Sequence, residues 1–451
     1  MPHDYLGNAL SPTSAATLAA IDDFVGGFLG YEQRMLRIVA AADADPASCL
    51  VNAYAGWLWM FLESPEAPAR AATYLARATA ASPGATRREQ LATELLRAWA
   101  GGDVDSAIAR AEAMLGQAPR DLAALKLHQY FNFNRGASPE MLRIALAALP
   151  SAGDVAQLHG MLAFAYEQCH LLGDAEAAAR RALAMLPREP WAQHALAHVM
   201  LTQGRILEGI GFLESVSHTW AGLTSFMDTH NWWHLALFYI SEGRGEDALA
   251  IYDAHVWARD RNYSQDQVGA VSLLARLELA GHPVGTRWHS LGEHLKARHA
   301  DTVEPFLTLQ YLYGLARAER PEADALLAAV AARAASAPGP LQATWAEVAL
   351  PAAQGLLAHA RGDHATARRA LGPTLGRMIE VGGSHAQRDL FQQIYLDSLL
   401  RTGARVAAQQ LLEERRRFEP DGVPLNRRLA ALYAERGLPA QAAEAAARAR
   451  R

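Results

Sequence analysis

Lysine and cysteine are the scarce residues of this 451-residue chain. Only two of its 42 basic residues are lysines, Lys126 and Lys296. This scarcity argues against a Schiff-base lysine, a phosphate-loop lysine and a polybasic membrane tail. The two cysteines, Cys49 and Cys169, lie far apart, which argues against a disulfide framework and against a cysteine zinc module.

The chain also lacks an excess of positive charge and any long apolar run. It carries 42 basic and 47 acidic residues, for a net charge of −5, which argues against a nucleic-acid partner. The first residues show no basic start followed by an apolar stretch, so no secretory signal is predicted. No uninterrupted apolar stretch approaches the 18 or so residues of a membrane span. We therefore expect a cytoplasmic protein without a membrane or nucleic-acid partner.

Strand patterns and the common enzyme motifs are missing as well. Alternating hydrophobicity is absent, while alanine, leucine, arginine and glutamate dominate, which predicts helices throughout. The sequence contains no G-x-S-x-G, no G-x-G-x-x-G, no phosphate loop and no H-E-x-x-H. Hydrophobic residues make up 51% of the chain and charged residues 20%, so it can bury a core.

What the chain does contain is a recurring glycine between two helical patterns. The instances are Gly102, Gly173, Gly204, Gly243, Gly281, Gly362, Gly403 and Gly437. Their spacing, mostly between 31 and 41 residues, is typical of helix–turn–helix solenoids. Glycine suits the turn because it adopts a positive φ without a steric penalty.

The clearest repeat is HNWWHLALFYISEGRGEDALAIYDAH (230–255). Its large, small and aromatic positions follow the tetratricopeptide pattern, with Ala236 and Ala248 where the paired helices touch. We predict an all-α, right-handed α-solenoid of tetratricopeptide-like helix–turn–helix repeats, continuous over residues 1–451. Within it we expect N-terminal capping helices (1–60), repeats with histidine pairs (90–300), an irregular segment (301–340) where the glycine register is lost, and C-terminal repeats (341–451).

Histidines form the main candidate site. His194 and His198 are spaced i,i+4, and so are His230 and His234, which places each pair on one helical face. The pairs lie 36 residues apart, or one repeat, on the stripe that faces the concave groove of such solenoids. We expect the four imidazoles to converge there as acid/base groups or metal ligands. The alternative, that each is a half-buried histidine with a single backbone or water partner, stays open.

Other residues are candidates for the same groove. Trp233 is expected to line it, Glu167 holds the corresponding position of the preceding repeat, and His255 ends the second helix of the same unit. A second block, GGSHAQRDLFQQ (382–393), begins with the N-cap Ser384. Its His385 and Asp389 are again spaced i,i+4, beside Arg388, so the carboxylate can fix the imidazole tautomer and raise its basicity.

Five segments resemble the tetratricopeptide-repeat protein 38 family and its bacterial relatives. They are AWAGGDVDSAIARAEAMLGQAPRDLAALKL (98–127), WAQHALAHVMLTQGRILEGIGFLE (191–214), HNWWHLALFYISEGRGEDALAIYDAHV (230–256), SLLARLELAGHPVGTRW (272–288) and GGSHAQRDLF (382–391). The resemblance implies an all-α repeat fold with a shared polar interior, but no reaction. The chain departs from the family's pattern at Leu307, Thr308 and Gln310, and it keeps only Asp266 of an expected pair of aspartates.

Two functions remain open from the sequence. One is a small-molecule site in the concave groove, with a divalent transition metal such as zinc, iron or copper held by neutral imidazoles. The other is a non-catalytic scaffold that binds a peptide or partner helix in that groove. The inner stripe carries histidines and aromatic residues rather than the lysines, arginines and asparagines of peptide-binding grooves, which favours the small-molecule site.

Overall fold

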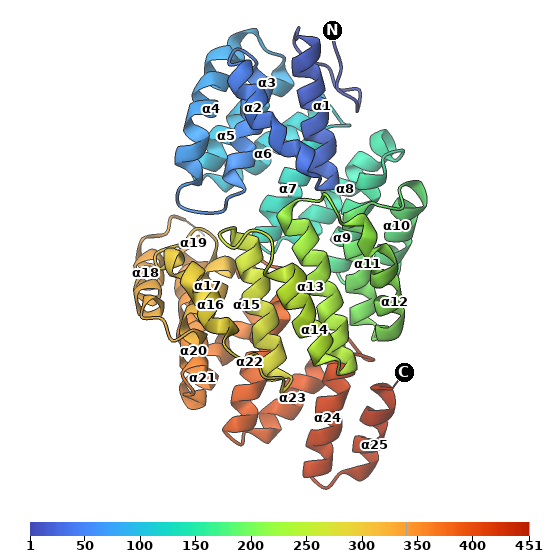
Figure 1. Cartoon of the computed structure of the whole chain (residues 1–451), viewed down its shortest axis with the longest axis vertical. Coiled ribbons are helices and arrows are strands. Elements are labelled where there is room, and N and C mark those ends of the chain that lie inside the picture. Colours follow the sequence, from blue (N-terminus) through green and yellow to red (C-terminus); the bar gives the residue numbers. More distant parts are fainter. Residues whose placement is uncertain (340, 451) are drawn as a thin grey trace. The chain divides into compact units, whose positions relative to one another are not determined.

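The fold consists of helices and their connecting turns (Figure 1). The computed structural model describes residues 1–339 and 341–450; Pro340 and Arg451, which end two of the predicted segments, lie outside them. The protein is 76% helical, and its described residues form no strand beyond two isolated bridges. The predicted all-α fold of tetratricopeptide-like repeats is therefore confirmed. No helix in the described ranges is both long and apolar enough to cross a membrane.

The chain divides into two compact units. The N-terminal unit comprises Met1–Ala195 and Ala221–Met227, and the C-terminal unit comprises Leu196–Trp220 and Asp228–Arg451. Helices α11 (Pro190–Thr202) and α13 (Ser225–Glu242) each begin in the first unit and end in the second. A single continuous, right-handed solenoid over both units stays a prediction.

The N-terminal unit is built mainly from helix pairs. Its α-helices are α1 (Ala15–Gly30), α2 (Ile38–Ala44), α3 (Cys49–Met60), α4 (Ala67–Ala81), α5 (Arg87–Ala100), α6 (Val104–Gln117), α7 (Leu122–Asn134), α8 (Ser138–Ala152), α9 (Ala156–Gln168) and α10 (Leu172–Met185). Small residues such as Ala107, Ala145 and Ala179 are fully buried, which lets neighbouring helices approach closely. Helix α3 packs on α4, so the predicted end of the capping segment at residue 60 falls inside a helix pair.

The C-terminal unit continues the same pattern. After α11 and α13, whose bounds are given above, its remaining α-helices are α12 (Ile206–Val216), α14 (Gly245–Ile251), α15 (Ser264–Leu279), α16 (Arg287–Leu295), α17 (Pro305–Arg317), α18 (Glu322–Ser336), α19 (Leu341–Ala343), α20 (Leu350–Ala360), α21 (His364–Leu371), α22 (His385–Arg401), α23 (Arg405–Arg415), α24 (Val423–Glu435) and α25 (Pro439–Arg448). Two short π-helical turns interrupt it, at Tyr252–Val256 and Thr344–Ala349.

The turns between paired helices hold a residue with positive φ, as predicted. Seven of the eight predicted glycines have this conformation; the exception is Gly173, which lies inside α10. The turn before α10 instead uses His170, with φ of 61°. Gly102, Gly136, His170 and Gly204 follow one another at intervals of 34 residues, the tetratricopeptide period. The repeat is therefore more regular than the glycines alone indicate.

The segment 301–340 is not irregular, which corrects the sequence prediction. It contains the paired helices α17 and α18, and Glu319, with φ of 55°, takes the turn position that glycine holds elsewhere. Glu319 follows Gly281 by 38 residues, so the register continues through this segment. A non-glycine residue in this conformation costs about 1–2 kcal/mol, so glycine is the residue expected at such a turn. Because this turn holds Glu319 instead, the glycine pattern does not reveal it.

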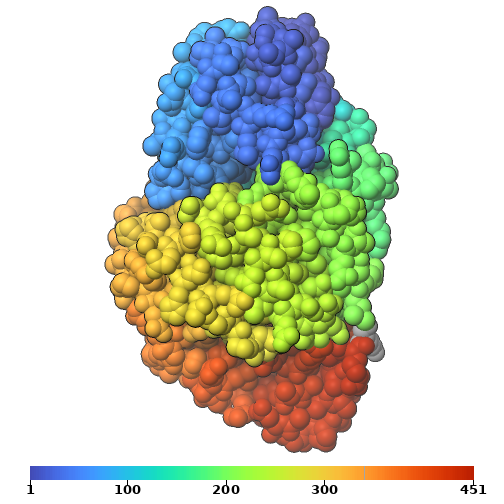
Figure 2. All heavy atoms as spheres, in the orientation of Figure 1, coloured from blue at the N-terminus to red at the C-terminus, as the bar shows by residue number. Residues whose placement is uncertain are grey.

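In the C-terminal unit, α24 contacts the ends of α13 and α15. Arg427 donates to the carbonyl of Ser241 at the end of α13, and Arg428 donates to the carbonyl of Leu279 at 2.8 Å. A Cβ atom on Gly204 would lie only 2.1 Å from the carbonyl oxygen of Asp421, so these two loops are in direct contact. In Figure 2 the red C-terminal segment accordingly abuts the yellow-green one. Further inside this unit, α15 packs on both α17 and α22.

Candidate functional site: a buried histidine cluster

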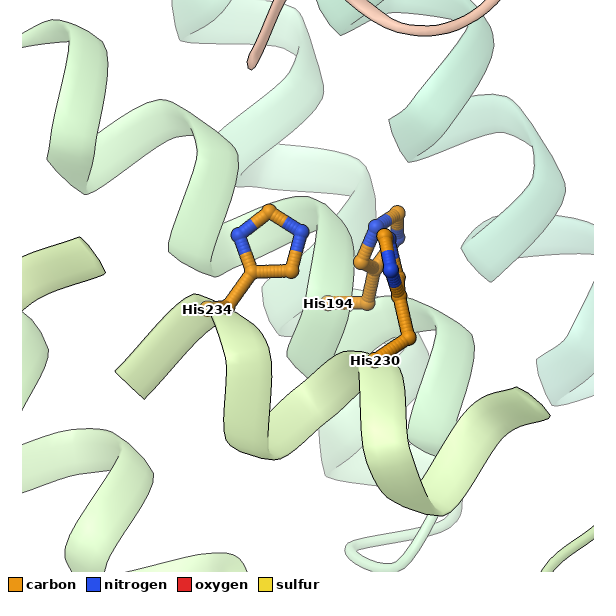
Figure 3. A group of neighbouring side chains, drawn as sticks. All are labelled: His194, His230 and His234. Carbon is orange, nitrogen blue, oxygen red and sulfur yellow. The ribbon is translucent and has the colours of Figure 1, made fainter. Parts of the chain in front are cut away.

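Three histidines of the C-terminal unit form a cluster in which His234 lies against both His198 and His230. His198 extends from α11. His230 and His234, both labelled in Figure 3, extend from adjacent turns of α13. The ring of His234 lies 4.5 Å from that of His198 and 4.8 Å from that of His230, measured between centroids. All three side chains are buried, with at most 8% of any one exposed. The predicted convergence of the two pairs is thus observed for these three residues, in an interior rather than an open groove.

His194 precedes His198 by one turn of the continuous helix α11 and is also buried. Its ring stacks on Trp191, with 4.4 Å between centroids and an interplanar angle of 22°. One ring nitrogen each from His194, His230 and His234 lies within 4.8 Å of the others (Figure 3).

Burial keeps His230 neutral. Desolvation, with a further contribution from His198, lowers the pKa of His230 to about 3. The neutral imidazole is the form that binds a transition metal or accepts a proton.

This shift makes stability depend on pH in the metal-free protein. The folded pKa of His230 lies below its unfolded value of about 6.5, so its contribution is intact above pH 6.5 and is lost as pH falls toward 3. Between pH 7 and 5 we expect a loss of about 2 kcal/mol in the free energy of unfolding, which His230→Asn removes. Urea unfolding at both pH values measures this; equal pH dependence of the two proteins would contradict it.

Trp233 packs directly on this cluster. Its ring is nearly parallel to that of His230, with an angle of 8° and 5.2 Å between centroids. The guanidinium of Arg276, on α15, lies 5.7 Å from the Trp233 ring. Trp232 points the other way, where it stacks on His255 at 3.7 Å. Of the two tryptophans, Trp233 is therefore the one beside the histidines, as predicted, although it is buried rather than groove-lining.

Arg276 connects the histidine cluster to the second sequence block. It donates to the carboxylate of Asp389 at 2.7 Å and to the backbone carbonyl of Ala386 at 2.5 Å. Arg415 also contacts Asp389, at 2.5 Å. Burial acts to raise the pKa of Asp389, but Arg415 and Arg276 outweigh it and the pKa lies below its usual value. Asp389 thus belongs to an ion-pair network with two arginines, and its predicted role as the partner of His385 stays a prediction.

The remaining candidates are placed around these groups. Arg388 is buried and donates to the carbonyl of Gly383, so it holds the loop before α22. Asp266 is buried and accepts from the hydroxyl of Thr229 and the backbone N–H of Asp260, both at 3.1 Å. His255 lies beside Trp232 on the opposite side of α13, and burial lowers its pKa against the influence of Asp228.

Two further predicted residues complete the set. His385 is the first residue of α22 and is partly exposed. Glu167 is buried at the end of α9, in the N-terminal unit, where it accepts from the side chain of Gln168 at 2.5 Å.

Sequence reasoning missed two buried amides. Asn231, between the histidines of α13, and Gln310, on α17, are fully buried. Neither side-chain amide has a hydrogen-bond partner among the described residues. Leaving such a group unpaired costs about 1–3 kcal/mol, and buried polar groups in folded proteins are nearly always paired. Gln310 is also one of the positions where the sequence departs from the pattern of the tetratricopeptide-repeat protein 38 family. That departure is the sequence signal that could have identified it.

A second group of potential ligands lies elsewhere in the C-terminal unit. His359, His364 and Asp397 offer ligand atoms within 4.8 Å of one another. His359 is hydrogen-bonded on both sides, with Nδ1 3.2 Å from the hydroxyl of Tyr313 and Nε2 3.1 Å from the Asp397 carboxylate. Because both nitrogens already have partners, this group provides a comparison for the main cluster.

Comparison with known proteins assigns no family. No protein-family model matches the chain. A structure of Naa15/Naa10 bound to HypK-THB is 17% identical, with a TM-score of 0.26, over 81% of this chain and 63% of that one. An IFIT1 monomeric mutant with Gppp-AAAA is 12% identical, with a TM-score of 0.42, over 96% and 99%. The P58(IPK) TPR domain is 14% identical, with a TM-score of 0.23, over 81% and 92%.

The chain thus spans less than two thirds of the Naa15/Naa10 chain that it matches. Membership of the tetratricopeptide-repeat protein 38 family stays an expectation.

Proposed function

We propose that this protein binds a small polar molecule in the interior of its C-terminal unit, at a divalent transition metal held by the histidine cluster. The observation that carries the proposal is that the ring of His234 lies against the rings of both His198 and His230, with all three side chains buried. Like-charged imidazolium groups at this distance would repel one another, so the cluster is stable only when neutral or metal-bound.

The donor set fits a metal such as zinc. Imidazole nitrogen is a preferred ligand of zinc, copper and iron, and catalytic zinc sites combine three protein ligands with an open position. The candidate ligands in the C-terminal unit are His198, His230 and His234. A bound metal would act as a Lewis acid on a ligand oxygen and would lower the pKa of a coordinated water.

The surrounding residues have separate tasks in this proposal. Trp233 fixes the ring plane of His230 by stacking. The unpaired amide of Asn231, which follows His230 in α13, would donate to and accept from a polar ligand. Arg276 holds Trp233 and the start of α22, where His385 lies, in one arrangement. An acid/base role for His385 belongs to the same proposal.

A peptide-binding scaffold is less well supported at this site. An extended peptide needs an open groove, whereas at most 8% of each cluster histidine in the C-terminal unit is exposed. A small molecule can enter such an interior through local opening of a helix pair.

Metal titration tests the proposal. Metal-free protein is titrated with Zn²⁺ against a chromophoric chelator, and the wild type is expected to take up one tightly bound equivalent. The variant His198→Gln/His234→Gln keeps side-chain size and should lose that equivalent, while circular dichroism shows unchanged helicity.

The matched control is His359→Gln/His364→Gln, which alters the other ligand group and should keep the equivalent. The proposal fails if the wild type takes up no zinc. It also fails if the control variant loses the zinc and the His198/His234 variant retains it.

A further inference from the structure

Lys126, in the N-terminal unit, has an unusual environment. It extends from α7, and its Nζ lies 3.2 Å from the ring centroid of Tyr31 and 4.6 Å from that of Phe28. It also donates to the backbone carbonyl of Phe28. The side chain is partly exposed, so molecules in solvent can reach it. One of only two lysines in the chain is thus set against aromatic faces.

A buried carboxyl group lies within electrostatic range of this amine. Glu189 is fully buried, and its Oε2 accepts from the backbone N–H of Ala192 at 2.5 Å. Its Oε1 has no hydrogen-bond partner among the described residues. An unpaired carboxyl oxygen beside a lysine is a group that a bound ligand can satisfy.

Tyr31 is held in a strained position at this site. Its backbone has φ of 55°, and its ring stacks on Trp191 at 5.2 Å with an angle of 29°. Non-glycine residues in this conformation cost about 1–3 kcal/mol and cluster at ligand sites. Tyr31, Phe28 and Trp191 therefore give the amine an apolar, aromatic surrounding.

The electrostatics point in the same direction. Desolvation lowers the pKa of Lys126 well below its usual value, with Glu189 opposing the shift. Burial raises the pKa of Glu189 to about 7, so a fraction of that carboxyl is protonated near neutral pH. Part of the negative charge of Glu189, which favours the ammonium form of Lys126, is then absent. A fraction of the Lys126 amine is therefore unprotonated.

We propose that Lys126 is a nucleophilic amine that forms an imine with a neutral aromatic aldehyde lying against Tyr31, Phe28 and Trp191. The amine nitrogen bonds to the carbonyl carbon, the carbonyl oxygen leaves as water, and one aldehyde and one amine give one imine. The scarcity of lysine in the sequence argues against such a residue, but it does not determine the environment of an individual lysine. This site is independent of the histidine cluster.

The test uses the small number of amines in the chain. The folded protein is incubated at pH 7.5 with benzaldehyde and sodium cyanoborohydride, which reduces the imine to a stable secondary amine. Peptide mass mapping then gives separate rates for Lys126, Lys296 and the N-terminal amine. An exposed lysine is unprotonated in only about one molecule in a thousand at this pH. We expect Lys126 to react at least about tenfold faster than Lys296, whose side chain lies on the surface.

Two controls distinguish reactivity from simple exposure. Replacing benzaldehyde by glyoxylate should reverse the preference, because an anion is disfavoured beside Glu189. Glu189→Gln removes the charge that favours the ammonium form and should speed the reaction of Lys126 about threefold. The proposal is overturned if Lys126 reacts no faster than Lys296, or reacts only after denaturation, since it would then be an ammonium held by the aromatic rings.

Discussion

Replacing Arg276 by methionine is expected to lower the free energy of unfolding of the C-terminal unit by about 3 kcal/mol. The guanidinium is buried and contacts Asp389, the carbonyl of Ala386 and the ring of Trp233. Its removal leaves the half-buried carboxylate of Asp389 with one arginine, Arg415, instead of two. Breaking a buried ion pair costs about 3–5 kcal/mol, and Arg415 keeps the loss at the lower end.

Urea unfolding followed by tryptophan fluorescence measures this effect. The matched control is Arg361→Met, which removes an exposed ion pair with Asp324 and should cost about 0–1 kcal/mol. Equal losses in the two variants would show that the Arg276 network does not stabilise the unit. Zinc uptake by Arg276→Met is expected to weaken as well, because Trp233 and the adjacent His230 lose their support.

The second large effect is expected at Arg88, in the N-terminal unit. Its buried guanidinium donates to Asp121 at 2.7 Å, to Asp4 at 3.0 Å and to the hydroxyl of Tyr54 at 3.1 Å. Arg88→Met leaves two buried carboxylates without their cation, at a cost of about 4–5 kcal/mol. Because Asp4 precedes α1, we also expect the first ten residues to become sensitive to limited proteolysis.

Arg135→Met provides the comparison in the same unit. It removes an exposed pair between Arg135 and Asp105, and we expect a change of about 0–1 kcal/mol without new cleavage. If Arg88→Met unfolds at the same denaturant concentration as this control, the N-terminal residues are not fixed by the buried pairs.

The sequence predicted the repeat better than it predicted the turns. Turn glycines are visible because only glycine adopts a positive φ without strain, and seven of those predicted have it. His170 and Glu319 occupy the same position at a steric cost that other contacts offset. No local pattern marks such residues, so Gly173 was chosen in place of His170 and the segment after residue 301 was expected to be irregular.

At the candidate site, the sequence predicts features that depend on local spacing but not those that depend on contacts between distant residues. The spacing of the histidines gives their shared faces and their repeat interval, and this was enough to predict that His198, His230 and His234 converge. The contact of Arg276 with Asp389 joins residues 113 positions apart and depends on closure of the C-terminal unit. Such closure is set by packing between many helices, so the sequence predicted neither this ion pair nor the burial of the cluster.

The location of a bound metal tests the central claim most directly. Crystals soaked in Zn²⁺ give an anomalous difference map measured above the zinc absorption edge. The account predicts one strong peak within bonding distance of ring nitrogens of His230 and His234, with His198 as a further ligand. A peak only at His359, His364 and Asp397, or no ordered peak at all, would contradict it.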